Sequence, residues 1–153
     1  ENVSSADNQQ ERLLTPDYIV GLVDGEGYFS VTPQFRNYGS YNSYEVNMVF
    51  GIELKESDER ILKEIQKWFG FGNLYRRIDK RKNFCNLAIY RVRNHRDILD
   101  RIIPFFQKYL LRIPSKQRKF KYFAKIGKIV AKKEYSNPEG FKKVEKLVAK
   151  MRQ

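Results

Sequence analysis

Two acidic side chains stand among glycines near the start of the chain, in the run Ile19 to Gly27. Glu26 has a glycine on each side, so no bulky neighbour keeps a phosphate away from its carboxylate. Hard divalent cations bind carboxylate, backbone carbonyl, water and phosphate oxygens. Glu26 and the carbonyl of Gly25 could supply the first two of these ligands. The alternative is that Glu26 is a surface acid at a turn.

The same run carries two glycines at helical spacing. Gly21 and Gly25 are four residues apart, so they lie on one face of a helix and remove the side chains that would hold another backbone away. We expect this short apolar helix, with Leu22 beside the glycines, to pack against a copy of itself. Such packing would bring two copies of Glu26 to one point.

Capping residues and apolar periodicity predict the elements that position this run. Thr15, Pro16 and Asp17 are typical of a helix start, as cap, preset first residue and first-turn acid. A period of two then predicts strands, and apolar residues three or four apart predict helices. The expected order is a helix from Thr15, strands 27–36 and 45–53, a helix over 57–70, strands 73–79 and 84–91, and helices over 94–109, 116–134 and 137–151.

This order predicts the α+β class, with a four-stranded antiparallel sheet and helices packed on one face. In the second hairpin we expect Cys85, Leu87 and Ile89 to face the helices, with Cys85 a small buried hydrophobe. Polar side chains would then occupy the other face, as an ordinary wet surface or as a ligand-binding one. The candidates are Ser30, Thr32, Gln34, Arg36, Asn47, Tyr75, Arg77, Asn86 and Tyr90, together with Glu45, Glu53 and Asp79.

The net charge of +12 is distributed unevenly along the chain. Residues 1–35 carry a net −5, residues 36–111 a net +6 and residues 112–153 a net +11. Two separate basic regions favour a polyanionic partner, of which nucleic acid is the commonest. Amide, hydroxyl and guanidinium groups on a β-ribbon can read base edges in the major groove of a duplex. A peripheral membrane protein is less suitable, because the apolar helix faces are needed for the core.

Length and composition exclude several other classes of protein. At 153 residues, one domain is expected over 15–153, after a flexible lead-in at 1–14. One cysteine and one histidine exclude an intramolecular disulfide, a cysteine-rich zinc site and a multi-histidine metal centre. The chain has no apolar run of membrane-spanning length and no signal-peptide core. We therefore expect a soluble intracellular protein, in a bacterial or archaeal cytoplasm or in an organelle.

The run at 19–27 resembles the signature of the LAGLIDADG homing endonucleases, and every position fits the residues that this family allows. It also stands where the family has it, on a helix that leads directly into a hairpin. The resemblance covers about residues 15–151. Further family landmarks are Phe50–Lys55, Phe69–Gly72, Ile103–Phe106, Pro114–Lys116 and Asn137–Phe141.

The resemblance implies an intron-encoded DNA endonuclease with a saddle-shaped sheet. Single-motif members act as homodimers, so each Glu26 would face one strand of a long, nearly palindromic duplex. The implied cofactor is Mg²⁺, although Mn²⁺ or Ca²⁺ could occupy the site, and the implied product is a double-strand break with 3′ overhangs. Glu26 and Gly25 would hold the metal, Asp24 would orient the paired helix ends, and Lys116 would stabilise charge near the scissile phosphate.

Other basic residues are expected to bind the DNA backbone. They are Lys55 at the end of the second strand, Lys80, Arg81 and Lys82 at the second hairpin tip, and Arg118 and Lys119 beside Lys116. Leu54 departs from the family pattern, since some members place a polar, water-positioning residue near there. This departure leaves open what orders the nucleophilic water.

Two other functions remain open at this point. Some members of the family are RNA-binding maturases that assist splicing, and the basic charge and aromatic turns suit RNA as well as DNA. A DNA-binding regulator without catalysis could use the same sheet face. Retention of the Gly25-Glu26-Gly27 run favours cleavage over both alternatives.

Overall fold

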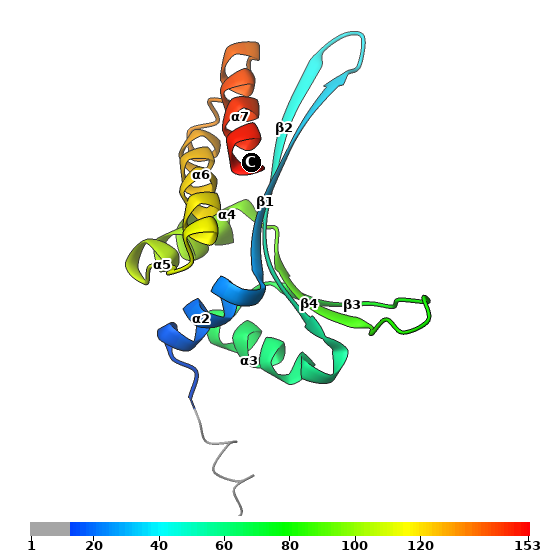
Figure 1. Cartoon of the computed structure of the whole chain (residues 1–153). Coiled ribbons are helices and arrows are strands. Elements are labelled where there is room, and N and C mark those ends of the chain that lie inside the picture. Colours follow the sequence, from blue (N-terminus) through cyan, green and yellow to red (C-terminus); the bar gives the residue numbers. More distant parts are fainter. Residues whose placement is uncertain (1–12) are drawn as a thin grey trace, which may run out of the picture.

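The computed structural model describes residues 13–153 (Figure 1). The expected lead-in at 1–14 lies outside these residues except for Leu13 and Leu14, which have no regular secondary structure. The elements are α2 (Pro16–Glu26), β1 (Gly27–Asn37), β2 (Asn42–Lys55), the 3-10 turn η1 (Glu56–Asp58), α3 (Glu59–Phe69), β3 (Asn73–Arg77), β4 (Leu87–Val92), α4 (His95–Asp97), the π-helical segment η2 (Ile98–Ile102), α5 (Ile103–Lys108), α6 (Pro114–Ala131) and α7 (Pro138–Met151).

The four strands form one antiparallel sheet in the order β1-β2-β4-β3, which confirms the predicted class and sheet. β1 and β2 pair over their full shared length, from Gly27 opposite Ile52 to Asn37 opposite Asn42. β2 and β4 pair only over 50–55 and 87–92, so the two hairpins diverge beyond this segment. Figure 1 shows the β1–β2 hairpin rising at the top and the β3–β4 hairpin extending to the right, which gives the sheet its saddle-like bend.

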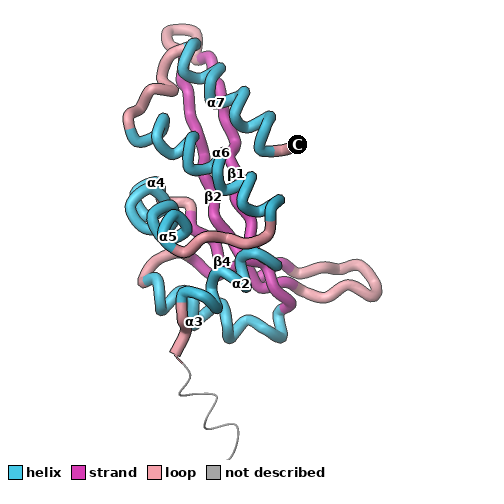
Figure 2. The backbone as a smooth tube through the Cα atoms, turned by 60° about the vertical axis from the view of Figure 1, so that its left-hand side comes forward, coloured by secondary structure: helices cyan, strands magenta, loops and turns pink. Residues whose placement is uncertain are grey.

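The helices lie together on one side of the sheet (Figures 1 and 2). The other side, between the diverging hairpins, is covered by no helix of residues 13–153; we call it the open face. The core lies under the helices and is centred on Phe29. The Phe29 ring centroid is 5.1–5.6 Å from those of Phe50, Phe106, Phe120 and Phe123, so aromatic packing joins β1, β2, α5 and α6.

The predicted helix ends are confirmed at several positions. The Thr15 hydroxyl accepts a hydrogen bond from the Tyr18 amide at 3.2 Å and so caps α2. The Asn137 side chain accepts from the Gly140 amide at 2.8 Å at the start of α7. Gly70 ends α3 in the left-handed region, at a φ of 84°, where a glycine has no steric penalty.

The helix expected over 94–109 is interrupted rather than continuous. Asn94 caps α4, which begins at His95, but α4 gives way to η2 and then to α5. Pro104 has no N–H to donate to the carbonyl four residues earlier, and its ring crowds that carbonyl. The π-helical turn ends two residues before this proline, in the segment where regular α-helical bonding would fail.

Strand β4 faces the opposite way from the prediction. Its residues Tyr90 and Val92 stand opposite the core residues Ile52 and Phe50, so the even-numbered side chains face the helices. Cys85 lies before the strand and is exposed, so its assignment as a buried hydrophobe was wrong. The prediction failed because residues 87–90 are apolar at odd and even positions alike, so alternation of polar and apolar residues does not distinguish the two faces.

Strand β1 lies at one edge of the sheet, and two features occupy its outer side. Pro33 interrupts its row of backbone donors. The Arg152 guanidinium, directly after α7, donates a hydrogen bond to the Val31 carbonyl at 3.2 Å.

Among residues 13–153, no helix combines the length and the apolar character that crossing a bilayer requires.

Candidate functional site

The carboxylate of Asp24 joins the end of α2 to the segment that begins α6. Its two oxygens accept hydrogen bonds from the Arg112 amide, at 3.0 and 3.2 Å, and one of them accepts from the Ile113 amide at 3.1 Å. Only 8% of Asp24 is exposed, so its charge is held by these donors rather than by bulk water. A role in orienting the helix end, as expected for Asp24, is therefore consistent with its contacts.

Glu26 is the last residue of α2, and its side chain is exposed. Gly25 before it is also exposed, and a Cβ placed on Gly25 would meet no atom within 4 Å. A carboxylate and free helix-end carbonyls suit a hard cation in their chemistry. They are too few for a complete site, because no cluster of three or more His, Cys, Asp or Glu side chains exists within residues 13–153. A complete coordination shell would need further oxygen ligands, such as water or phosphate.

Lys116, in the first turn of α6, reaches the same place. Its ammonium group donates a hydrogen bond to the carbonyl of Gly27, directly after Glu26. Burial and the neighbouring charge of Lys119 lower the pKa of Lys116, whereas the carboxylates of Asp24 and Glu26 act in the opposite direction. Lys116 thus lies near Glu26, whose charge acts on it, although the two residues are 90 positions apart in the sequence.

The glycine-notched side of α2 is open to a partner. Gly21 is exposed, and a Cβ placed on it would meet nothing within 4 Å, while Leu22 is half-buried. A shallow hollow of about 740 Å³ adjoins it, lined in part by residues 108–112. Leu110 nearby is 68% exposed. A helix that approached this side would cover apolar surface, and neither Gly21 nor Gly25 would present a side chain to it.

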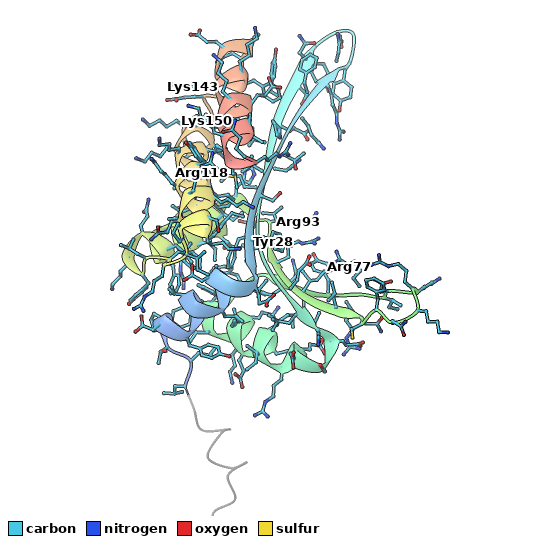
Figure 3. All side chains as sticks on the ribbon, in the orientation of Figure 1. Tyr28, Arg77, Arg93, Arg118, Lys143 and Lys150 are labelled. Atoms are coloured by element: carbon cyan, nitrogen blue, oxygen red, sulfur yellow. The ribbon has the colours of Figure 1, made fainter. Side chains whose placement is uncertain are left out.

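The open face carries most of the polar residues expected there, among them Arg77, which Figure 3 labels. On β1 the residues Ser30, Thr32, Gln34 and Arg36 alternate with the core positions. Residues placed with them by the strand register are Asn47 and Lys55 on β2 and Tyr75 and Arg77 on β3. The Arg77 guanidinium lies 3.3 Å from Glu53, so two of these side chains form an ion pair on this face.

Tyr90 does not belong to the open face, so its assignment as a DNA contact was wrong. The side chain is fully buried, and its hydroxyl donates to the Phe71 carbonyl at 2.8 Å. Burial raises the pKa of Tyr90 well above its usual range. A tyrosine can occupy this core position because its one polar group finds a partner there.

Asn86 is also engaged within the protein, contrary to the expectation of a DNA contact. Its side-chain amide donates to Glu56 at 3.0 Å, and its side-chain oxygen accepts from the Asp79 amide at 3.0 Å. The residue therefore braces the base of the second hairpin.

Arg118 is likewise engaged within the protein, since it donates to the Lys150 carbonyl at 2.9 Å and to the Gln153 carbonyl at 3.0 Å. Lys119 beside it is exposed.

The tip of the second hairpin is basic and exposed, as expected for Lys80, Arg81 and Lys82. The Arg81 guanidinium is held by Asp79 at 2.6 Å and lies 3.8 Å from the centre of the Phe84 ring. Both lysines keep their full side-chain reach into solvent. The tip therefore presents two exposed lysines and one arginine that Asp79 and Phe84 hold in place.

Sequence reasoning missed three residues of the open face: Tyr28, Arg91 and Arg93. Arg91 stands opposite Gly51, and Gly51 stands opposite Tyr28, so Tyr28 and Arg91 lie on one row of the sheet. Arg93 follows β4 and is exposed, and Figure 3 shows Tyr28 and Arg93 near the centre of the bend. Arg91 and Arg93 are charged residues at odd-numbered positions, and they could have shown that the odd-numbered side of β4 faces away from the core. Leu54 faces the core, so its apolar character leaves the open face unaffected.

The family model described as LAGLIDADG endonuclease matches residues 19–127, which is more than half of the chain. The chain belongs to the LAGLIDADG endonuclease family. This LAGLIDADG domain is 29% identical over 140 residues to a Neurospora crassa protein named probable intron-encoded endonuclease 3, and 31% identical over 130 residues to the Schizosaccharomyces pombe probable intron-encoded endonuclease Cox1-I1b. The matches cover 92% and 85% of this chain but only 25% and 30% of the relatives, so the chain spans less than a third of their length.

Two solved structures show the same fold. The homing endonuclease I-TnaI superposes on the LAGLIDADG domain with a TM-score of 0.76 and 30% identity, over 93% of this chain and 90% of that one. I-SmaMI bound to an uncleaved DNA target with calcium ions superposes with a TM-score of 0.75 and 28% identity. That match covers 90% of this chain and 45% of the I-SmaMI chain, so the domain corresponds to about half of it.

Proposed function

We propose that this LAGLIDADG protein is a site-specific homing endonuclease. It binds a long pseudo-palindromic duplex as a homodimer and hydrolyses both strands with a divalent metal, leaving 3′ overhangs. The observation that carries the proposal is the meeting of Glu26 and Lys116 at the end of α2, beside the polar open face. The DNA-bound structure of I-SmaMI, a protein of similar fold, supports DNA as the substrate.

The domain by itself supplies half of a cleavage site. Glu26 and the Gly25 carbonyl are the oxygen ligands that it offers, and a second copy placed against Gly21 and Leu22 would double them. DNA phosphates and water would complete the coordination of Mg²⁺. When bound, the metal activates water for attack and stabilises the leaving 3′ oxygen. Lys116, held at the Gly27 carbonyl, places a positive charge where the phosphate gains negative charge.

The shape of the open face sets the length of the target. β1 has 11 residues, which at about 3.3 Å each span roughly 36 Å, or about 10 base pairs. Two sheets related by a two-fold axis would cover about 20 base pairs. Lys55, Lys80 and Lys82 lie at the margins of each sheet, where they would bind phosphates.

The test begins with selection of a cleavage site from a randomised duplex library in the presence of Mg²⁺. Cutting of the selected duplex is then compared between the wild type and Glu26→Gln, with Glu64→Gln on α3 as a matched control away from the site. We expect Glu26→Gln to bind the duplex but to cut it at least about 100-fold more slowly. Equal cutting by Glu26→Gln and the wild type would refute the proposal.

Dimerisation has its own test. Gly21→Leu would place a bulky side chain on the notched side of α2, so we expect a monomer by light scattering and loss of double-strand cutting. Ala149→Leu, at an exposed position of α7, is the control for an added leucine elsewhere on the surface. A dimer that survives Gly21→Leu would show that the two copies meet elsewhere.

A second candidate function is RNA binding as a maturase, and the charge of the helical layer favours it. The segment α6 contains six Lys or Arg side chains and no acidic one. Figure 3 labels Arg118, Lys143 and Lys150 on α6 and α7, on the side of the sheet opposite the open face. Charge reversal of Lys128 and Lys143 should then abolish RNA binding and leave duplex DNA binding intact. Equal loss of both activities would favour a single nucleic-acid surface.

A further inference from the structure

Arg91 is held in a defined position near the middle of the open face. Its Nε donates a hydrogen bond to the hydroxyl oxygen of Tyr28 at 3.0 Å. The carbon of its guanidinium group lies 5.5 Å from the centre of the Tyr75 ring. The side chain is half-buried, and it is contacted from β1 on one side and β3 on the other. Few open-face side chains are ordered from two directions in this way.

Gly51 makes this arrangement possible. Tyr28, Gly51 and Arg91 stand opposite one another on β1, β2 and β4. A Cβ placed on Gly51 would lie 2.3 Å from the Cζ atom of Tyr28, which is far inside contact distance. The Tyr28 ring therefore lies across β2 in the space that a side chain would fill. Its hydroxyl reaches the next strand only because residue 51 is a glycine.

No acid of the described part of the chain neutralises the charge of Arg91. Neighbouring arginines of the second hairpin are paired with acids: Arg76 with Glu59 at 2.8 Å, Arg77 with Glu53 and Arg81 with Asp79. Within residues 13–153, Arg91 forms no salt bridge. Because Nε is occupied by a neutral hydroxyl, the two terminal nitrogens keep their donors and their full positive charge.

We propose that Arg91 determines specificity by donating from its two terminal nitrogens to O6 and N7 of a guanine, one in each half of the DNA site. Tyr28 is a positioning residue that aims the guanidinium. The inference rests on the proposed DNA-binding function and deepens it. Tyr28 lies two residues after Glu26, so the guanine is expected close to the centre of the target, next to the cleaved segment.

A base contact suits this position better than a phosphate contact. Arg91 lies within the sheet, at the segment where β2 pairs with β4, and not at a hairpin tip. Sheet side chains that enter a major groove meet base edges, whereas phosphates lie along its margins. A planar pair of donors, ordered before binding, matches the two acceptors of guanine and loses little conformational freedom on contact. A lysine would keep the charge but not this geometry.

The test uses the duplex selected from the randomised library and measures binding by competition at constant salt. We expect the selected site to hold a guanine at one symmetric pair of positions. Replacing it by adenine, or by 7-deazaguanine, which lacks the N7 acceptor, should weaken wild-type binding by about 5-fold to 150-fold. Arg91→Lys should show less than a two-fold preference at that position and unchanged preferences elsewhere. Lys67→Ala on α3 removes an exposed charge on the helical side and should keep the guanine preference.

Tyr28→Phe tests the positioning role, because it keeps the ring and removes only the hydroxyl that orders Arg91. We expect a several-fold loss of guanine preference with an unchanged thermal midpoint, which a merely structural role would not produce.

One result would show a phosphate contact and overturn the assignment. In that case Arg91→Lys and Arg91→Ala would lose binding uniformly at every sequence, and the salt slope of Arg91→Ala would fall by about one. Absence of any selective binding by the wild type would overturn the proposed function itself. Selective binding with an intact guanine preference in Arg91→Lys would overturn only the role of Arg91.

Discussion

Removal of the Asp24 carboxylate should loosen the connection between the end of α2 and the start of α6. In Asp24→Ala the amides of Arg112 and Ile113 both lose a charged acceptor at 3.0–3.2 Å in a site that is 8% exposed. A hydrogen bond to a charged group contributes about 1.5–3 kcal/mol. Two such bonds, with some compensation by water, amount to about 3–5 kcal/mol of the free energy of unfolding.

This loss is large compared with the stability of a typical domain, about 5–15 kcal/mol. For a chain of this length each kcal/mol moves the thermal midpoint by about 2–4 °C, so we expect a fall of roughly 6–20 °C. The measurement is urea and thermal unfolding followed by circular dichroism. Asp17→Ala is the matched control, because Asp17 is an exposed acid in the first turn of the same helix, with an expected cost of about 0.3–1 kcal/mol.

Asp24→Asn should fall between the two, since it keeps one acceptor oxygen but loses the charge. If Asp24→Ala costs no more than Asp17→Ala, the carboxylate does not hold this turn and the reasoning fails. Cleavage adds a second readout. Because Lys116 follows the braced segment, Asp24→Ala should also slow cutting at temperatures where the variant is still folded.

Three further outcomes follow from contacts in the sheet and at the end of α2. Gly51→Ala should lower the free energy of unfolding by about 1 kcal/mol, because the new methyl group displaces the Tyr28 ring. In a Tyr28→Ala background the same substitution should cost nothing. Equal costs in the two backgrounds, measured by urea unfolding, would contradict the collision. Burial lowers the pKa of Lys116, so the unfolded chain holds this proton more tightly, and stability should rise with pH from the folded pKa up to about 10.5. Lys116→Met should flatten that rise in unfolding curves taken across alkaline pH, and an unchanged slope would argue against a buried lysine. Tyr90→Phe should cost about 1–2 kcal/mol, since the Phe71 carbonyl loses a donor at 2.8 Å, and a change below about 0.5 kcal/mol would show that water replaces it.

The sequence predicted the fold correctly where a residue type has a single, local structural role. Thr15 as a cap, Gly70 as a left-handed stop and Asn137 as a second cap all act within a few residues of themselves. The meeting of Glu26 and Lys116 was expected from the family resemblance. It depends on the folding of the 89 residues between them, which spacing and periodicity do not describe.

The orientation of β4 was the main feature that the sequence did not reveal. Leu87 and Ile89 are as apolar as Ala88 and Tyr90, and the decision is made by the partner strand, since Ile52 of the core stands opposite Tyr90. A tyrosine in a polar row was a misleading signal, because the acceptor for its hydroxyl lies on a separate loop at residue 71. With the strand reversed in this way, Arg91 was not among the residues expected on the open face.

The outer side of β1 has a consequence for behaviour in concentrated solution. An unpaired strand edge is a template on which a second chain can add a strand, and such pairing leads to aggregation. In this protein Pro33 removes a donor from that edge, and the Arg152 guanidinium occupies the acceptor of Val31. Two chains that meet through β1 would therefore lack two of the backbone hydrogen bonds that an added strand needs, which disfavours strand addition at this edge.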